Sequence, residues 1–376
     1  MGGMLSGKSE IDQLNTLVGS LGELHEQLRE MAPLNALTRI AVAVYDAQTD
    51  LLRTFIHSSG QKTPLSHYVA KLADVPSLRE IAESGLPRVV NDISFYNPDS
   101  QHSKKVLEGG YRSSYTLPLL QSGELKGFLF FNAVELDFFN PLRLSLLWPY
   151  AQVAAFLAMS ELDRIHVIQA AVSTVRQISR ERDEETGAHL ERMSRYTRLI
   201  AEDMAVSHCL SDEYIEFLFQ FAPLHDIGKV GVPDNILLKP GTFTPEELER
   251  MRTHVSKGSD IITMMTEHFS SYRIPHMGML FNVVSYHHEN WDGTGYPHGM
   301  KGEEIPLEAR ITAVADVFDA LTSERPYKHA WSNQQAFDFL EANIGIKFYE
   351  PCVRAMLDNK PRIEEIQRQF QEAEFD

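Results

Sequence analysis

The chain has 376 residues, 43% of them hydrophobic, which is enough for two domains that each have a core. The formal net charge of −17 argues against a nucleic-acid partner, although metals and a few cations would make a site for a small anionic substrate locally positive. The two cysteines, Cys209 and Cys352, lie in no pairing motif and favour a reducing compartment, which we take to be the cytoplasm.

A leucine pattern near the N-terminus predicts the first helix. Within residues 11–31 the apolar positions are spaced alternately by three and four: Leu14, Leu17, Leu21, Leu24, Leu28 and Met31. This is the a/d spacing of a heptad, so the helix either pairs with a second copy of the chain in a homodimer or packs on its own domain. The run is too short to separate the two arrangements.

The following segments have the alternation and the turn residues of β-hairpins. The four predicted strands are residues 39–45, 51–57, 114–120 and 125–132. A turn rich in Asp and Thr joins the first two, Ser122-Gly123 joins the last two, and a helix around residues 77–84 lies between the hairpins. This pattern predicts an antiparallel sheet with flanking helices, an α+β domain over residues 1–150.

Short motifs in this domain resemble those of the GAF sensory family. They are Val89–Asp92, Gly110–Tyr115, Leu117–Leu119 and Gly123–Phe128. The resemblance covers residues 30–160 and implies a small-ligand sensor or a dimerisation platform. No cysteine stands where a bilin would attach, and the aromatic pairs Phe130-Phe131 and Phe138-Phe139 fit a core better than a cofactor site.

An apolar stretch, Leu144–Met159, raises the question of a membrane span. It is shorter than the roughly 20 residues that a span needs, and Pro149 and Gln152 interrupt it, so we expect a buried helix and no membrane span. The start of the chain is rich in Gly and Ser and does not resemble a secretory signal. Helical spacing continues, with a break near Gly187, and predicts a connecting helix over residues 151–180.

The second domain, residues 181–376, carries eight candidate metal ligands that are all His, Asp or Glu. They are Glu185, His189, His225, Asp226, His254, His287, His288 and Asp316. Such donors suit a hard or borderline cation such as iron or manganese better than a structural zinc. Because the surrounding segments have helical spacing, we expect them to bring these groups together in the core of a helical bundle, where hydrolytic chemistry can be done.

Taken singly, these residues are weak signals. Glu185 and His189 lie four apart and would share one face of a helix, but such a pair is usually solvated on the surface. His225-Asp226 closes a helical stretch that begins near Ser211. Adjacent helical side chains point about 100° apart, so a bridging arrangement suits this pair better than one shared metal, and ordinary capping is the alternative.

Their surroundings strengthen the metal interpretation. The capping box Thr244–Glu247 begins a new helix that reaches His254. His287-His288 ends an apolar helix and precedes a turn rich in Asp, Gly and Pro. Asp316 lies in the apolar run Ile311–Leu321, where an unpaired carboxylate is costly to bury and a metal would satisfy it.

Together, these motifs resemble the HD-GYP family of cyclic di-GMP phosphodiesterases, a branch of the HD phosphohydrolases. The matching segments are 185–189, 225–229, His254, 287–297, 305–311, 315–323 and 325–328, an order and spacing that chance does not produce. The resemblance implies an all-α domain with two or three divalent metal ions, usually iron or manganese. The eight residues named above would be their ligands, with Asp226 bridging.

The same resemblance implies hydrolysis of cyclic di-GMP under regulation by the GAF-like domain. A hydroxide held between two cations about 3.5–4 Å apart would attack one phosphodiester in line. Lys229 would stabilise developing charge or protonate the departing ribose oxygen, and we count Asp226 with it as catalytic. Arg325 and Lys328 look like the family's phosphate-contacting pair. Alternatively, Lys229 only tethers Asp226, and Arg325 and Lys328 are a solvated pair at a helix end.

Two other functions stay open beside the enzyme. A catalytically weak cyclic dinucleotide sensor, or a module that docks a protein partner through the Gly293–Pro297 loop, would keep the same pocket. Cyclic GMP-AMP is an alternative substrate, because no residue can be assigned to reading a guanine edge. Tyr349-Glu350-Pro351 stands where the family usually has Phe-Asp-Pro, a change that removes no ligand. The intact ligand set and Lys229 favour the enzyme.

Overall fold

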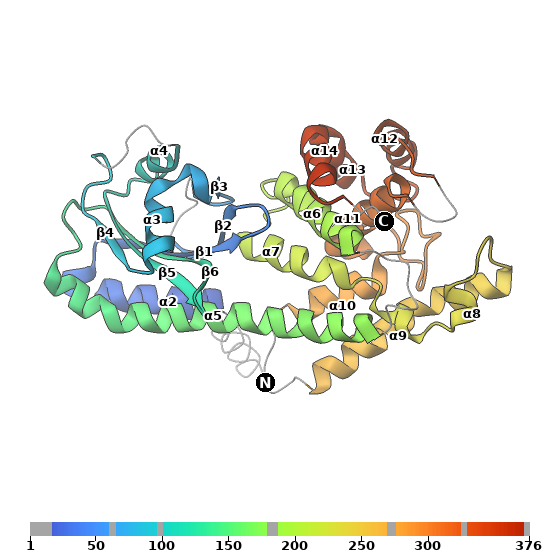
Figure 1. Ribbon diagram of the computed structural model, residues 1–376, viewed down its shortest axis with the longest axis horizontal. Helices are drawn as coiled ribbons and strands as arrows, with labels where there is room; N and C mark the ends of the chain where they lie inside the picture. Colours follow the sequence, from blue (N-terminus) through green and yellow to red (C-terminus); the bar gives the residue numbers. More distant parts are fainter. Residues whose placement is uncertain are drawn as a thin grey trace, which may run out of the picture. The chain divides into compact units, whose positions relative to one another are not determined.

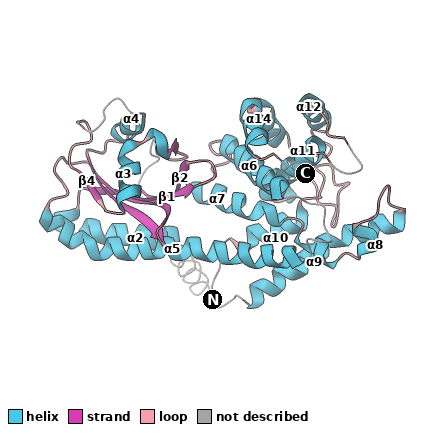
Figure 2. Cartoon of the chain, in the orientation of Figure 1, coloured by secondary structure: helices cyan, strands magenta, loops and turns pink. Residues whose placement is uncertain are grey.

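The computed structural model describes residues 17–59, 65–95, 101–178, 187–268, 276–324 and 329–371. The chain divides into two compact units, Met1–Arg164 and Ile165–Asp376, and the boundary falls inside helix α5 (Pro141–Ile178). The strands, magenta in Figure 2, belong to the first unit, and the second unit is helical. Each unit is described separately below.

The first unit is built on a six-stranded antiparallel sheet with the strand order β3-β2-β1-β6-β5-β4. Its strands are β1 (Leu37–Asp46), β2 (Leu51–Ser58), β3 (Val69–Lys71), β4 (Arg88–Val90), β5 (Ser113–Gln121) and β6 (Glu124–Ala133). The predicted hairpins are β1–β2 and β5–β6, and they pair with each other through β1 and β6. The predicted α+β class is therefore confirmed.

The turn between β5 and β6 shows why this hairpin forms here. Ser122 and Gly123 both have positive φ angles, 52° and 86°. A two-residue turn with positive φ at both positions matches the right-handed twist of the strands that it joins, and glycine adopts it without steric cost. The turn therefore fixes the register in which Gln121 pairs with Glu124.

Helices cover both faces of the sheet (Figure 1). Helices α3 (Pro76–Ser84) and α4 (Gln101–Glu108) lie over one face, and α2 (Leu17–Glu30) and the first part of α5 lie over the other. Leu17, Leu21 and Leu28 are buried and α2 contacts β1 and β2, so its leucine face packs against its own sheet. Leu14 lies outside the described residues, and the homodimer stays a prediction.

Helix α5 corrects the prediction of a short buried helix over Leu144–Met159. The helix runs through Pro149. By length and composition its apolar part, Pro141–Arg164, could cross a membrane, and only 22% of its apolar stretch is buried. A single helix of this kind is weak evidence for a span. Its buried face, spaced by three and four, is Leu147, Ala151, Ala154 and Ala158, whereas Trp148, Val153 and Phe156 on the opposite side are exposed.

The second unit packs helices around an apolar core. The helices are α6 (Gly187–Met204), α7 (Asp212–Phe221), α8 (Asp234–Leu237), α9 (Pro245–His268), α10 (Met277–Tyr286), α11 (Leu307–Thr322), α12 (Asn333–Ala342), α13 (Glu350–Asp358) and α14 (Lys360–Gln369). Helix α6 contacts α7, α11 and α13, and α10 contacts α9 and α11. Tyr196 and Phe318 meet edge to face in this core, with ring centroids 5.4 Å apart. The predicted all-α class is confirmed.

Side-chain caps begin two of these helices, and the second cap is the capping box that the sequence predicts. The Ser211 hydroxyl accepts a hydrogen bond from the backbone N–H of Tyr214 and caps α7. At the start of α9, the Thr244 hydroxyl accepts from the N–H of Glu247, and the Glu247 carboxylate accepts from the N–H of Thr244, which is a complete capping box. These caps set where α7 and α9 begin, and the second therefore sets how far His254 lies along α9.

Candidate metal centre

The His225-Asp226 pair is positioned by a change of helix type. Helix α7 ends at Phe221, and Pro223 lies at the start of a 3-10 turn, η4 (Ala222–Leu224), that leads directly to the pair. Proline suits this place because it lacks the N–H that a continuing α-helix would need. The tightened turn lets the His225 Nδ1–H donate to the carbonyl of Ala222 over 3.0 Å. The imidazole is thereby held with Nε2 pointing the other way.

Seven of the eight candidate ligands lie in the described residues, and the structure brings them together in two adjacent groups. The first group is Asp226, His254, His287 and His288, and the second is His189, His225 and Asp316; in each, the donor atoms lie within 4.8 Å of one another. Glu185 lies outside the described residues, as do Arg325 and Lys328, so the structure says nothing of their predicted roles.

Asp226 joins the two groups. Its Oδ1 lies 3.0 Å from His254 Nε2 and 3.6 Å from His287 Nε2, both in the first group. Its Oδ2 lies 3.1 Å from Nε2 of His225, which belongs to the second group. There His225 Nε2 and His189 Nε2 lie 3.7 and 4.0 Å from Asp316 Oδ1. One carboxylate thus presents an oxygen to each group, as the expected bridging role requires.

Backbone and side-chain acceptors fix the tautomers of four of these histidines. The Nδ1–H groups of His225, His254 and His287 donate to carbonyls three or four residues earlier, at Ala222, Met251 and Val283, over 2.8–3.0 Å. The Nδ1–H of His189 donates to the Asp319 carboxylate over 2.7 Å. Such outer partners leave Nε2 unprotonated and aimed at the centre, the form in which histidine binds a metal.

The buried atoms of the first group fit a cation. Nε2 of His254, Nε2 of His287 and Oδ1 of Asp226 are buried without a hydrogen-bond partner. With Nδ1 protonated, each Nε2 directs a lone pair at a carboxylate oxygen, so acceptors face one another in a site that excludes water. This arrangement costs free energy unless a positive ion lies between the acceptors. The donor set and its geometry are therefore consistent with a bound metal.

The charge states also favour metal binding. Burial opposes ionisation of Asp226, but the Lys229 ammonium is the largest of the influences that outweigh it and hold the pKa of its carboxyl well below the usual range. Burial lowers the pKa of His287, and burial together with His287 lowers that of His288. An ionised carboxylate and neutral imidazoles are the protonation states that metal ligands require.

A glycine lets the loop carrying Asp226 approach helix α9. Gly228 lies in the 3-10 turn η5 (Ile227–Gly231), where a Cβ atom would collide with the backbone carbonyl of His254 and the backbone nitrogen of Gly258. Both neighbours are main-chain atoms of α9 and cannot rotate away. This close approach is what places Asp226 within reach of His254.

Replacement of Gly228 by alanine is expected to destabilise the second unit by about 1–3 kcal/mol, because the overpacked backbone must separate. A fall in the midpoint of urea unfolding, followed by circular dichroism, measures this effect. The matched control is Gly278→Ala near the start of α10, where a Cβ atom meets nothing within 4 Å. Equal stability of the two variants would contradict the close-packing interpretation.

Lys229 lies at the edge of the centre. Its Nζ is 2.9 Å from Asp226 Oδ2, and its side chain is 19% exposed. Turn η5 sets this position, since the backbone N–H of Lys229 donates to the carbonyl of Asp226. An ammonium here holds the Asp226 carboxylate and is partly exposed to solvent, so this position is compatible with both roles considered for it.

The loop after His287-His288 is held against the centre by a residue that sequence reasoning missed. The buried Glu289 carboxylate accepts hydrogen bonds from the backbone N–H groups of His298 and Met300, over 2.7 and 3.0 Å. The Tyr296 ring then stacks on His288 with centroids 4.8 Å apart, and the Arg252 guanidinium lies 4.9 Å from the Tyr296 centroid. The loop predicted to dock a partner therefore also covers one side of the first group.

Asp319 is a second residue that the prediction missed. Besides accepting from His189, its carboxylate receives the Arg192 guanidinium at both oxygens, over 2.6 and 2.9 Å, and the Ser323 hydroxyl over 2.9 Å. Burial alone would raise the pKa of Asp319, but the hydrogen bonds from His189 and Arg192 lower it by more, so the pKa lies below its ordinary value. The sequence does contain an indication of this role: Asp319 lies one helical turn after Asp316 in the same apolar run, where burying a carboxylate carries the same cost.

Replacement of Asp319 by asparagine is expected to weaken metal binding by roughly 10–100-fold, the usual effect of losing the outer partner of a histidine ligand. The amide keeps the shape but removes the charge that orients and polarises His189. Titration of the metal-stripped protein with Mn²⁺, followed by calorimetry, measures the change. Unchanged affinity would mean that Asp319 serves only to bury Arg192.

The part of the chain that carries the candidate metal centre is similar to a known protein family. Residues 182–353 match the model of the HD domain family, and all seven described donors lie inside that range.

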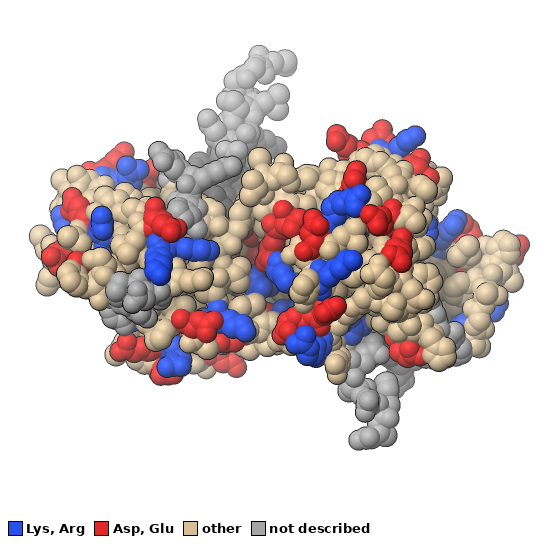
Figure 3. Space-filling view, turned by 90° about the horizontal axis from the view of Figure 1, so that it is seen from above, with Lys and Arg blue, Asp and Glu red and all other residues tan. Residues whose placement is uncertain are grey.

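On the face drawn in Figure 3, Lys and Arg side chains are interspersed with Asp and Glu.

Two curated relatives and one solved structure are similar to parts of the chain. The cyclic di-GMP phosphodiesterase response regulator RpfG of Xanthomonas campestris is 45% identical over 192 residues, 51% of this chain and 48% of that protein. The 3'3'-cGAMP-specific phosphodiesterase 2 of Vibrio cholerae is 38% identical over 178 residues, 47% of this chain and 32% of that protein. The chain thus spans about half or less of these relatives. A GAF domain/HD domain protein from Geobacter sulfurreducens superposes with a TM-score of 0.30 and 14% identity, covering 38% of this chain and 93% of that one.

Proposed function

We propose that this chain is a metal-dependent phosphodiesterase that hydrolyses cyclic di-GMP, and the match of residues 182–353 to the model of the HD domain family supports this proposal. The observation that carries the proposal is the pair of donor groups that share Asp226. The 45% identity to a cyclic di-GMP phosphodiesterase over 192 residues supports the substrate. The nitrogen and oxygen donors, with no thiolate among those described, support iron or manganese as the metal.

The described donors divide naturally between two ions. Asp226, His254, His287 and His288 would hold one, and the second group together with Asp226 would hold the other, with Glu185 as a further expected ligand. Bound ions would activate water at neutral pH and neutralise phosphate charge, which hydrolysis of an anionic diester needs. The residues themselves keep the imidazoles neutral, hold Asp226 ionised and exclude water from the donor atoms.

Lys229 contributes a positive charge at the edge of the centre. We propose that its ammonium stabilises negative charge on the reacting phosphate and supplies a proton to the departing ribose oxygen. Its contact with Asp226 holds the Nζ atom in place for this task. Arg325 and Lys328 are proposed to hold the phosphates. They would give a chain of net charge −17 the local cations that an anionic substrate requires.

The first unit is proposed to regulate the second, and both are proposed to act in the cytoplasm. The continuous helix α5, which crosses the boundary between the units, supports mechanical coupling. Cys209 and Cys352 are free thiols, which supports a reducing compartment. A protein partner at the Gly293–Pro297 loop stays a further proposal.

The test is an assay with a parallel metal analysis. Purified protein is loaded with Mn²⁺ or Fe²⁺, its metal content is measured by elemental analysis, and cyclic di-GMP products are separated by chromatography. We expect about two metals per chain or more, and a linear dinucleotide or GMP as product. Loaded protein that releases no product with either metal, while binding cyclic di-GMP tightly by calorimetry, would replace the enzyme with a sensor.

A second substrate has specific support. The similarity to a 3'3'-cGAMP-specific phosphodiesterase, at 38% identity over 178 residues, favours testing cyclic GMP-AMP in the same assay. A ratio of kcat/KM values for the two cyclic dinucleotides decides between them. A value at least tenfold higher for cyclic GMP-AMP would reassign the substrate and leave the metal centre as described.

A further inference from the structure

Arg252 is an exposed arginine on helix α9, two residues before the candidate ligand His254. Its side chain is 42% exposed, and its guanidinium carbon lies over the ring of Tyr296, 4.9 Å from the ring centroid. A contact of this kind stabilises a cation on an aromatic face and limits the directions in which its N–H groups can point. The Tyr296 ring therefore holds the guanidinium in place.

The same ring connects Arg252 to the first donor group. It stacks on His288 with centroids 4.8 Å apart and an angle of 27° between the planes, and the backbone N–H of Tyr296 donates to the His288 carbonyl over 3.2 Å. His288 is the member of that group that is only partly buried, whereas the other three donors are buried. A molecule that reaches the donors from the side of His288 would therefore meet Tyr296 and Arg252 as well.

Charges at the centre also act on the Tyr296 hydroxyl. Burial raises its pKa, the Asp226 carboxylate raises it further, and the cations Arg252 and Lys229 oppose the rise. Arg252 and the centre thus lie close enough to one side chain for both to affect its ionisation. Because the phenol stays neutral near pH 7, it does not compensate the charge of Arg252.

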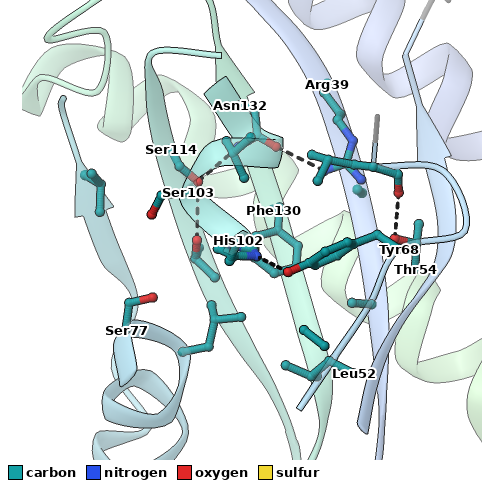
Figure 4. Close-up of a pocket in the computed structure, with 18 of the residues that line it drawn as sticks. Arg39, Leu52, Thr54, Tyr68, Ser77, His102, Ser103, Ser114, Phe130 and Asn132 are labelled. Atoms are coloured by element: carbon teal, nitrogen blue, oxygen red, sulfur yellow. Dashed lines mark hydrogen bonds between the residues drawn. The ribbon is translucent and has the colours of Figure 1, made fainter. Parts of the chain in front are cut away.

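The polar partner of Arg252 among the described residues is weak. Its Nη1 lies 3.5 Å from the carboxylate of Glu249, one turn earlier on α9, and the Glu249 side chain is 75% exposed. An exposed pair at this distance adds little to stability, so a ligand can displace it. By contrast, Arg39 of the first unit is buried and donates to Asn132 Oδ1 over 3.2 Å, as a dashed line in Figure 4 shows. Arg252 is better placed than such an arginine to contact a ligand.

The proposed substrate contains one kind of group that still needs a partner. Metal ions, Lys229 and the proposed pair Arg325 and Lys328 account for the phosphates of a cyclic dinucleotide, but not for its two bases. Guanine has two acceptors, O6 and N7, on one edge, and a planar guanidinium can donate to both at once. Adenine carries an N6 amino donor in place of O6, so an arginine can pair only with its N7. A guanidinium beside the centre can therefore distinguish the two bases.

We propose that Arg252 is a specificity-determining residue, which donates to O6 and N7 of one guanine of the bound nucleotide. This inference rests on the proposed function and adds the base that the site recognises. Two ring contacts, Arg252 on Tyr296 and Tyr296 on His288, separate the guanidinium from a metal donor, so one nucleotide can span them. Cyclic di-GMP and cyclic GMP-AMP, which both contain guanine, would be accepted, whereas cyclic di-AMP would be discriminated against.

Kinetics on the Mn²⁺-loaded full chain test this inference with cyclic di-GMP and cyclic di-AMP. We expect the wild type to favour cyclic di-GMP at least tenfold, measured as KM, or as Ki where a dinucleotide is not hydrolysed. Arg252→Gln should raise KM for cyclic di-GMP about 10–100-fold with kcat and metal content unchanged. Cyclic di-AMP should bind this variant as well as or better than the wild type, because glutamine pairs with adenine. An equal loss for both dinucleotides would make Arg252 a phosphate contact, and that result or an unchanged KM would overturn the inference.

Equilibrium binding gives a second readout that needs no turnover. Calorimetry of the Mn²⁺-loaded chain should give a Kd at least tenfold lower for guanosine 5′-monophosphate than for adenosine 5′-monophosphate, and a ratio near one in Arg252→Gln. Arg250→Gln is the matched control, since Arg250 is an exposed arginine of the same helix. This control should keep the kinetics and the binding ratio of the wild type.

The two assays separate this inference from the proposed function. A wild type that hydrolyses neither dinucleotide but binds guanine nucleotides selectively through Arg252 would remove the enzyme and keep the inference. An active wild type that has no base preference in either assay would overturn the inference alone. A wild type without turnover and without nucleotide binding would overturn both.

Discussion

Replacement of Asp226 by asparagine is expected to remove most of the bound metal and to lower phosphodiesterase kcat/KM by on the order of 10³-fold or more, since several kcal/mol of transition-state stabilisation depend on the metals. Asp226 presents one oxygen to each donor group, so the change affects both. An amide lacks the charge that balances the ions and presents an N–H₂ group to one side. Elemental analysis and the chromatographic assay measure the two effects on one sample.

Asp338→Asn is the matched control, because it makes the same substitution at an exposed position of α12 in the same unit. That variant should keep its full metal content and activity. If Asp226→Asn folded normally and retained two metals per chain with undiminished turnover, Asp226 would not be the bridge between the two groups.

Replacement of Lys229 by methionine is expected to lower kcat by about 10²–10⁴-fold while the metal content stays at the wild-type value. Methionine keeps most of the length of the side chain but cannot donate a proton or carry charge. Measuring kcat and the metal content of the same variant separates the two roles of Lys229. If it only tethers Asp226, metal affinity should fall and activity should return when excess Mn²⁺ is added.

Lys347→Met provides the comparison for this variant, since Lys347 is exposed and lies outside both donor groups. Its kcat should equal that of the wild type. Normal turnover in Lys229→Met at saturating metal would rule out proton donation by Lys229.

The elements with a short-range cause could be predicted from the sequence. The hairpins follow from alternating apolar residues around turns such as Ser122-Gly123, and in the structure both residues of this turn have positive φ angles. The starts of α7 and α9 follow from side-chain caps at Ser211 and Thr244 that act within one helical turn. In each case the physical cause lies within a few residues, so the local sequence contains all of it.

The convergence of the donors had no such local cause. His189 and Asp316 lie on α6 and α11, and nothing in either segment alone states that these helices pack together. Their shared motif order made the prediction possible, and the structure brings together every candidate ligand that it describes. Their role as metal ligands stays a prediction.

What the sequence did not reveal depends on long-range packing. The burial of α5 was overestimated because an apolar composition does not say how many of its faces find a partner. Glu289 and Asp319 were missed because each acts by holding another group. Glu289 binds the backbone of the loop that reaches Met300, and Asp319 orients the ring of His189.

The arginine that supports Asp319 also reaches the far end of the chain. Arg192 Nη1 donates to the backbone carbonyl of Phe370, directly after helix α14, over 2.9 Å. The ring of His189 is thus linked, through one carboxylate and one guanidinium, to a residue 181 positions later. Shortening α14 by a turn, or fusing a tag tightly to it, would take away that acceptor and loosen a donor of the candidate metal centre without changing any residue within it.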